Sequence, residues 1–453
     1  MIFVRLLRGF MLKKGMGHLC AVLKESLYWG FGVQILLGLV WMGRNFSAVQ
    51  TFAESKSFLY RGLFRLTGSH AQIMYLLQLI FGIAAADFFF NSLSQASTGK
   101  RVFRSLALVT FPMAMQCHLA LGIWSFSGSL LFIQAGCAAR IWLEKSGEKK
   151  PLYRRLAGSL TCWILLSLLM PEYRLFGGIL TGVTAVVLLC REKRGKIRLR
   201  LLLVTLCGAL LATGAGTGTA ALSGEKHRSV EFSMASRFAW FFILSDFYGW
   251  PEEVLEALGE SVREITFYPD NMERVMQPLM EEAFGEEGAD AYYRQIAWNA
   301  LENRWKNILT YLRWDMVGYG AAPIAVQKQL EGGYYDSCTA ENYEKMREQA
   351  PEWTRLYLSY SCWWFRAMLG IAFLIFLVDW IQRGHFPLKQ ELPALLPLIL
   401  TAAVMIFWYT MRGAGLMDYK EGFAISSLWL ALALLLLKEE KGKDGLAEKQ
   451  KFS

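Results

Sequence analysis

The sequence is poor in charged residues. Asp, Glu, Lys and Arg make up 19% of its 453 residues, whereas soluble proteins have about 25%. Apolar residues make up 54%, and the mean hydropathy is +0.28. This composition excludes an intrinsically disordered chain, because such chains combine few apolar residues with a high net charge.

Motifs for common soluble chemistry are also missing. The chain has no C-x-x-C pair, no H-E-x-x-H and no G-x-x-x-x-G-K-[ST], which excludes the usual zinc-ribbon, zinc-protease and phosphate-loop sites. The five histidines show no metal-ligand spacing, and His118 is predicted to make a polar contact between helices. The small-residue segment 213–218 lacks a lysine and is predicted to pack helices together. The sequence predicts no cofactor and leaves a divalent metal ion open.

The net charge of +10 divides unevenly along the chain. Residues 224–360 contain 23 acidic and 13 basic residues, so this segment has a net charge of −10 and the rest has +20. The basic part alternates long apolar runs with short Lys/Arg clusters, which is typical of multi-pass membrane proteins. The positive charge therefore indicates orientation in a membrane, and no nucleic-acid partner is predicted.

Ten apolar runs can cross a bilayer as helices. The predicted fold class is all-α: a polytopic membrane protein with about ten transmembrane helices and a helical extracytoplasmic domain between helices seven and eight. The predicted spans are 26–42, 71–93, 105–124, 125–142, 156–170, 175–190, 201–222, 362–382, 392–411 and 422–437.

Charges in the loops predict the topology. Alternate loops carry 27 Lys and Arg residues, whereas the opposite short loops carry seven. The protein is predicted to lie in the plasma membrane, and the positive-inside rule predicts that both termini are cytoplasmic. The predicted domains are a basic interfacial N-terminus (1–25), a seven-helix membrane module (26–222), an acidic extracytoplasmic helical domain (223–360), a three-helix membrane module (361–437) and a cytoplasmic tail (438–453).

Three helices are predicted within or next to the extracytoplasmic domain, the first of them opening at Pro251 and stopping near Gly259. Residues 290–312 place apolar side chains at helical spacing. Pro351, followed by Glu352, is predicted to open the helix that runs into the eighth span.

Polar residues gather at the predicted outer ends of the spans. Ionisable groups at this depth are costly unless they are paired or functional. Together they offer a carboxylate that can act as a general base and cations that can bind a phosphate; the alternative is ordinary charged loop ends at headgroup level. They are Glu54, Lys56 and Arg61 in the amphipathic stretch 51–66, Glu172, Tyr173 and Arg174 in the third outer loop, Arg237 and Trp240 after the seventh span, and Arg412, Asp418 and Lys420 in the last outer loop.

Four segments of the chain resemble one family. Residues 54–66, 168–173, 236–240 and 341–355 are similar to segments of an uncharacterised, largely clostridial branch of the GT-C integral-membrane glycosyltransferases. These are relatives of the protein O-mannosyltransferases and of the bacterial lipid A aminoarabinose transferases. The resemblance implies transfer of a sugar from a polyprenyl-phosphate-linked donor to an envelope glycan or lipid acceptor at the outer face.

The resemblance also implies roles for individual residues. Glu54 is implied as the catalytic base, and Arg237, with Arg174 or Lys420, as the group that binds the donor phosphate. Catalytic members carry an aspartate in the first outer loop, but residues 46–50 contain no acid here. Either Glu54 has taken over that role, or the activity has been lost or changed.

The alternative is a non-catalytic or divergent membrane protein of envelope polysaccharides. It includes a polymerase- or ligase-like protein, a transporter and an assembly factor. A transporter should contain broken helices in matched positions of two halves; Pro112, Pro393 and Pro397 could break helices but form no such pair. Asp87 and Asp379 lie toward the inner ends of their spans, where a snorkelling or paired structural role is predicted in preference to a coupling-ion site.

Overall fold

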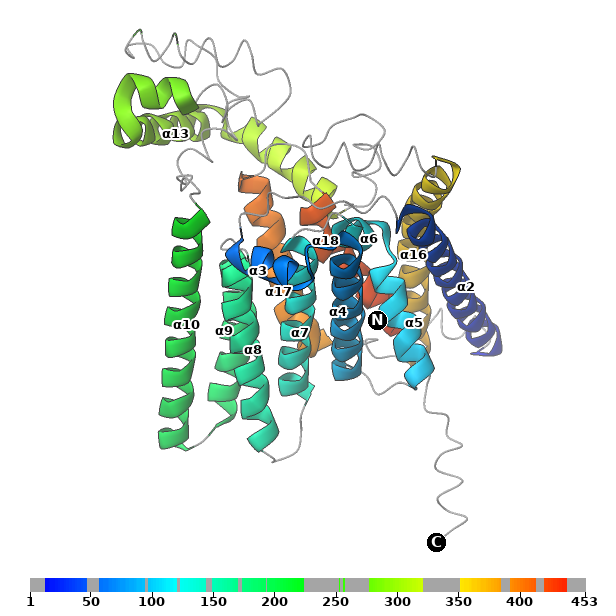
Figure 1. The fold of residues 1–453 in the computed structure, drawn as a ribbon. Coiled ribbons are helices and arrows are strands. Elements are labelled where there is room, and N and C mark those ends of the chain that lie inside the picture. Colours follow the sequence, from blue (N-terminus) through cyan, green and yellow to red (C-terminus); the bar gives the residue numbers. More distant parts are fainter. Residues whose placement is uncertain are drawn as a thin grey trace.

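The computed structural model is built from helices alone in the residues that it describes. These residues are 13–46, 57–93, 97–119, 123–143, 149–169, 173–192, 194–223, 252, 256, 277–320, 351–383, 392–412 and 419–437. Six helices there are long and apolar enough to cross a membrane, and a shorter apolar helix spans Leu395–Ile406. The chain is therefore an all-α polytopic membrane protein, which confirms the predicted fold class (Figure 1).

Helical structure occupies all ten predicted spans. The six helices that meet the criteria for a span lie within α2, α4, α7, α9, α10 and α16. In chain order the helices are α2 (Lys13–Asn45), α3 (Phe58–Leu66), α4 (Ala71–Leu93), α5 (Thr98–Val109), α6 (Pro112–Leu119), α7 (Ile123–Leu143), α8 (Lys149–Leu169), α9 (Arg174–Arg191), α10 (Gly195–Ser223), α13 (Gln277–Gly320), α16 (Pro351–Arg383), α17 (Leu392–Arg412) and α18 (Tyr419–Leu436).

Two of the three helices predicted around the extracytoplasmic domain are confirmed, and the one predicted from Pro251 lies almost wholly outside the described residues. Residues 290–312 lie inside the longer α13, and α16 begins at Pro351. Proline fits the first turn of a helix because its missing N–H would have no intrahelical partner there.

The third predicted span, 105–124, is two helices, which corrects the prediction of one continuous helix. α5 ends at Val109, and α6 begins at Pro112. Proline lacks a backbone N–H, and its ring clashes with the carbonyl of the preceding turn. The chain therefore leaves the helical path at Thr110 and Phe111.

Side chains from two other helices bind the backbone at this break. The Gln34 amide on α2 donates to the carbonyl of Ala107 over 3.3 Å, and the Tyr357 hydroxyl on α16 donates to the carbonyl of Thr110. A membrane-embedded backbone must find its hydrogen-bond partners within the protein. The break is therefore stabilised by α2 and α16 together.

The helices of the membrane module run in alternating directions, and α13 lies beyond one end of them (Figure 1). α13 contacts α17 and α18. We call this end the α13 face; it carries α3, the N-terminal end of α9 and the C-terminal end of α10. The other end, the opposite face, carries the C-terminal ends of α7 and α9 and the N-terminal ends of α8 and α10.

The pair formed by α2 and α16 is among the most closely packed in the bundle. Gly30 lets the two helices approach, because a β-carbon at this position would lie 2.0 Å from the Trp364 ring. The Tyr360 hydroxyl donates to the Gly30 carbonyl over 2.9 Å. One end of the pair is fixed by Trp41, whose indole N–H donates to the Thr354 hydroxyl over 2.8 Å.

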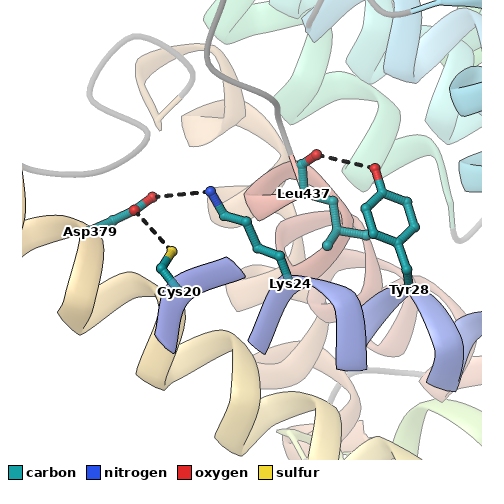
Figure 2. A network of polar contacts seen from close by, with 5 residues as sticks. All are labelled: Cys20, Lys24, Tyr28, Asp379 and Leu437. Atoms are coloured by element: carbon teal, nitrogen blue, oxygen red, sulfur yellow. Dashed lines mark hydrogen bonds and ion pairs between the residues drawn. The ribbon is translucent and has the colours of Figure 1, made fainter. Parts of the chain in front are cut away.

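Polar contacts fix α2 toward the opposite face (Figure 2). The Lys24 ammonium lies 3.9 Å from the Asp379 carboxylate on α16, and the Cys20 thiol donates to the same carboxylate over 3.4 Å. One turn further on, the Tyr28 hydroxyl donates to the carbonyl of Leu437 over 3.3 Å, next to the end of α18. These contacts confirm the predicted paired role of Asp379.

Asp87 on α4 has a charged partner as well. Its carboxylate lies 3.5 Å from the Arg101 guanidinium on α5. This pair confirms the second predicted structural role, because buried or interfacial carboxylates in membrane helices are stabilised by pairing.

Candidate functional site

The helix of the first predicted outer loop, α3, lies across the α13 face (Figure 1). It contacts α8 and α10. Ser57 caps it: its hydroxyl accepts from the Tyr60 amide and donates to the carbonyl of Leu168 over 3.3 Å. The start of α3 is therefore fixed against the C-terminal end of α8.

Tyr60 attaches the other side of α3 to the bundle. Its ring is buried and contacts Phe126 on α7 at 6.2 Å between centroids. Its hydroxyl accepts from the Gln78 amide on α4 over 3.2 Å. Burial raises the pKa of Tyr60, so it is a neutral anchor and cannot supply a charge to the site.

Arg174 is the first residue of α9 and lies at the α13 face, about one helical turn before Gly178. The Trp163 indole N–H donates to the Arg174 carbonyl over 2.7 Å, which fixes the backbone there. The Arg174 guanidinium reaches α10, where it lies 3.5 Å from the carbonyl of Thr213. Among the described residues this is the one hydrogen bond found for the guanidinium, so it retains donors for an anionic group.

Tyr173 has a different role from its neighbour. Its side chain is 2% exposed and packs against Phe176, with ring centroids 5.4 Å apart. It supports the start of α9 from inside the bundle, so the structure assigns this predicted supporting residue to packing.

The segment 213–218 is part of the continuous helix α10. A phosphate loop needs an irregular backbone with several free amides, so the helix excludes that interpretation. Gly216 lies against Arg174 and Ser167, at 3.4 and 3.8 Å from a β-carbon built on the glycine, which confirms the predicted packing role at this position. A β-carbon built on Gly214 or Gly218 would meet no described residue within 4 Å, so close packing is not seen at these two positions.

Only some of the predicted site residues lie in the part of the chain that the structure describes. Arg61 is exposed on α3, and Arg412 and Lys420 lie on the described backbone at the α13-face ends of α17 and α18. Glu54, Lys56, Glu172, Arg237, Trp240 and Asp418 lie outside the described residues. The structure thus brings α3, Arg174 and the end of α10 to one face, and the relation between Glu54 and Arg237 stays a prediction.

His118 makes the predicted polar contact between helices. Its Nδ1 lies 2.5 Å from the Ser125 hydroxyl on α7, and its ring fills the space beside Gly82 on α4. Across the ranges that the structure describes, no three His, Cys, Asp or Glu side chains form a group that could hold a metal ion.

One polar cluster was missed by the sequence reasoning. The Gln134 amide on α7 donates to the carbonyl of Gly177 over 2.8 Å and to the Thr181 hydroxyl over 2.6 Å, both on α9. Ser159 on α8 lies 3.0 Å from the same hydroxyl. A glutamine inside an apolar run was the available signal, and the contacts identify it as a connector of three helices.

A small apolar crevice lies between α7 and α17. It has room for about one water molecule, with a volume of about 10 Å³. Its lining contains no ionisable side chain, so it offers no chemistry for a reaction. The residues that line it are Gly128, Leu131, Phe132, Leu398, Thr401, Ala402 and Met405.

The chain matches no protein-family model, no curated protein and no solved structure.

Proposed function

We propose that the protein transfers a sugar from a polyprenyl-phosphate-linked donor to a cell-envelope acceptor, a glycan or a lipid, at the α13 face. Such a donor is amphipathic: its isoprenoid chain lies in the bilayer and its phosphosugar at headgroup level. A polar site where membrane helices end suits both parts of it. In this proposal the α13 face is the outer face of the plasma membrane, and both termini are cytoplasmic.

One observation carries the proposal. The Ser57 cap holds the first-loop helix against the end of α8, and Arg174 follows that end directly in the chain. The first loop is the part of the chain that contains Glu54, and Arg174 has a guanidinium that can bind a phosphate. In this proposal Glu54, as the general base, and Arg174, as a phosphate ligand, act at one membrane depth.

The reaction consists of one exchange of bonds. An acceptor hydroxyl attacks the anomeric carbon of the donor, and its proton passes to the Glu54 carboxylate. The bond between the anomeric carbon and the phosphate oxygen breaks, and polyprenyl phosphate departs. Arg174, with Arg237 and Lys420, stabilises the negative charge that develops on the departing phosphate.

The test is an assay of the purified full chain in lipid vesicles. A polyprenyl-phosphate donor with a radiolabelled sugar and an envelope extract as acceptor are supplied, and both labelled product and released polyprenyl phosphate are measured. We expect Glu54→Gln to lower kcat by roughly 10²–10⁴-fold with little change in KM, because a general base acts in the transition state. Glu25→Gln, at an exposed position on α2, is the matched control and should retain full activity.

Arg174→Gln tests the phosphate ligand. We expect kcat/KM to fall by roughly 10²-fold, since one charge-assisted contact to the departing group is lost. Arg65→Gln, exposed on α3 at the same face, is the control and should have no such effect. Full activity of Glu54→Gln would overturn the role of Glu54. A wild-type chain that binds the donor without consuming it would favour the non-catalytic alternative.

A further inference from the structure

A second polar region lies on the opposite face, away from the proposed site. The ends of α8, α9 and α10 meet there, because each of these helices contacts the other two. They bring together a group of basic residues with exposed or half-buried side chains: Arg154, Arg155, Arg191, Arg194, Lys196, Arg198 and Arg200.

Two of these arginines stabilise the end of α7. Arg191 donates to the carbonyls of Ile141 and Trp142, the latter over 2.8 Å, and Arg155 donates to the carbonyl of Arg140 over 3.4 Å. The last carbonyls of a helix have no intrahelical partner, so these two side chains have a structural task.

The basic residues at the start of α10 have no such task. Lys196, Arg198 and Arg200 are exposed, and no hydrogen bond or ion pair of their side chains is found within the described ranges. The nearest acid in sequence, Glu192, is buried and accepts hydrogen bonds from the Tyr153 hydroxyl and from the Arg194 amide. The positive charges of Lys196, Arg198 and Arg200 are therefore available to an external anion.

An exposed apolar surface continues from these cations along the same side of α10. Lys196, Leu199, Arg200 and Leu203 share one side of the helix by their spacing. Leu199, Leu203 and Leu210 are 58%, 51% and 73% exposed. The leucines extend over about 16 Å from Leu199 to Leu210 at the rise of an α-helix, which matches about half the thickness of a bilayer core.

We propose that this surface binds an anionic phospholipid. The headgroup phosphate contacts Lys196 and Arg200, and the acyl chains lie against Leu203, Leu210 and the leucines between them. A soluble polyanion or an acidic protein would match the charge but would leave the apolar surface unused. Only an amphiphile matches a cationic end and an apolar side on one helix, and α10 is the candidate span with the smallest buried fraction, 22%.

The test is lipid binding to the purified full chain, measured by native mass spectrometry. Phosphatidylglycerol and phosphatidylcholine with identical acyl chains are titrated separately. We expect the wild type to prefer phosphatidylglycerol by roughly 25-fold, since each of the two basic residues at the membrane surface contributes about fivefold. The double variant Lys196→Gln/Arg200→Gln should bind phosphatidylglycerol roughly 25-fold more weakly and bind phosphatidylcholine unchanged.

A control variant removes the same charge from the α13 face. Arg65→Gln/Arg355→Gln changes two exposed arginines and should alter phosphatidylglycerol binding by less than about twofold.

Glycerol phosphate tests the apolar half of the site. Since it has no acyl chains to bury, it should bind at least about 100-fold more weakly than the lipid.

Four results would overturn the proposal: equal affinity for the two lipids, unchanged binding by the Lys196/Arg200 variant, an equal loss in the control, or glycerol phosphate binding as tightly as the lipid. None of these measurements depends on sugar transfer, so the lipid site and the proposed activity succeed or fail separately.

Discussion

The two helices that flank residues 224–350 are held in the bundle in different ways. α16, which follows this segment, packs on α2 through buried aromatic residues such as Tyr357 and Trp364. α10, which precedes it, turns several leucines outward, and 22% of its most apolar stretch is buried compared with 39% in α16. α16 is therefore fixed in the bundle by contacts with protein, whereas α10 leaves a large part of its apolar surface exposed.

The largest effect is expected where α2 meets α16. In Gly30→Ala the new methyl group would overlap the buried Trp364 ring, so we expect the free energy of unfolding to fall by about 3 kcal/mol. The measurement is reversible unfolding in mixed micelles. Gly32→Ala is the control, because its new β-carbon would meet no described residue within 4 Å; equal stability of the two variants would contradict the close packing.

The hydrogen bond between Trp41 and Thr354 should have the next largest effect. Thr354→Val keeps the shape of the side chain but leaves the buried indole N–H of Trp41 without its acceptor, so a loss of about 1.5 kcal/mol is expected. A double-mutant cycle with Trp41→Phe isolates the bond and should give a coupling energy of about 1 kcal/mol. A coupling energy near zero would mean that the bond does not contribute.

A smaller effect is expected where α10 meets α8. In Gly208→Ala the new methyl group would lie 2.4 Å from a terminal methyl of Leu160. That methyl can move by side-chain rotation, so the expected loss is about 1 kcal/mol. Gly214→Ala, which meets nothing within 4 Å, should be neutral or slightly stabilising. If Gly208→Ala lowered the free energy of unfolding as much as Gly30→Ala, the conclusion that α10 is packed less tightly than α16 would be wrong.

The ion pair of Lys24 with Asp379 should contribute least. The pair is 3.9 Å apart and Lys24 is partly exposed, so Lys24→Gln is expected to cost about 0.5 kcal/mol. Lys24→Arg should retain most of that energy. The same unfolding measurement at high salt should reduce the difference between the wild type and Lys24→Gln; no dependence on salt would argue against an ionic contact.

Local features were predictable where a nearby residue dictates them. α4 begins and ends at the predicted residues 71 and 93, because polar residues flank a mainly apolar run of span length. α16 begins at Pro351 as predicted. Pro112 is a possible helix breaker by its residue type, but the prediction of one continuous helix through Pro112 was wrong.

Contacts between distant residues were not predictable in the same way. Gln34 and Tyr357 bind the break at Thr110 from 76 and 247 residues away, and no local pattern encodes such pairs. In the candidate site, Arg174 was chosen from its position at the end of a span, but its contact with Thr213 follows only from the packing of α9 on α10. Glu54 and Arg237 stay predictions.

The sequence by itself determined the class of the protein, because helices that cross a bilayer must be long and apolar, and residues near their ends must carry the charge. The uneven distribution of charge along the sequence also predicted the orientation in the membrane. On α10, basic residues from this distribution are the ones that we propose bind an anionic lipid. Tertiary structure decided which glycines are essential: Gly30 and Gly32 are two residues apart, but only Gly30 faces Trp364. The physical reason is that an apolar run has the same composition on all its sides, and only packing decides which side meets protein and which meets lipid.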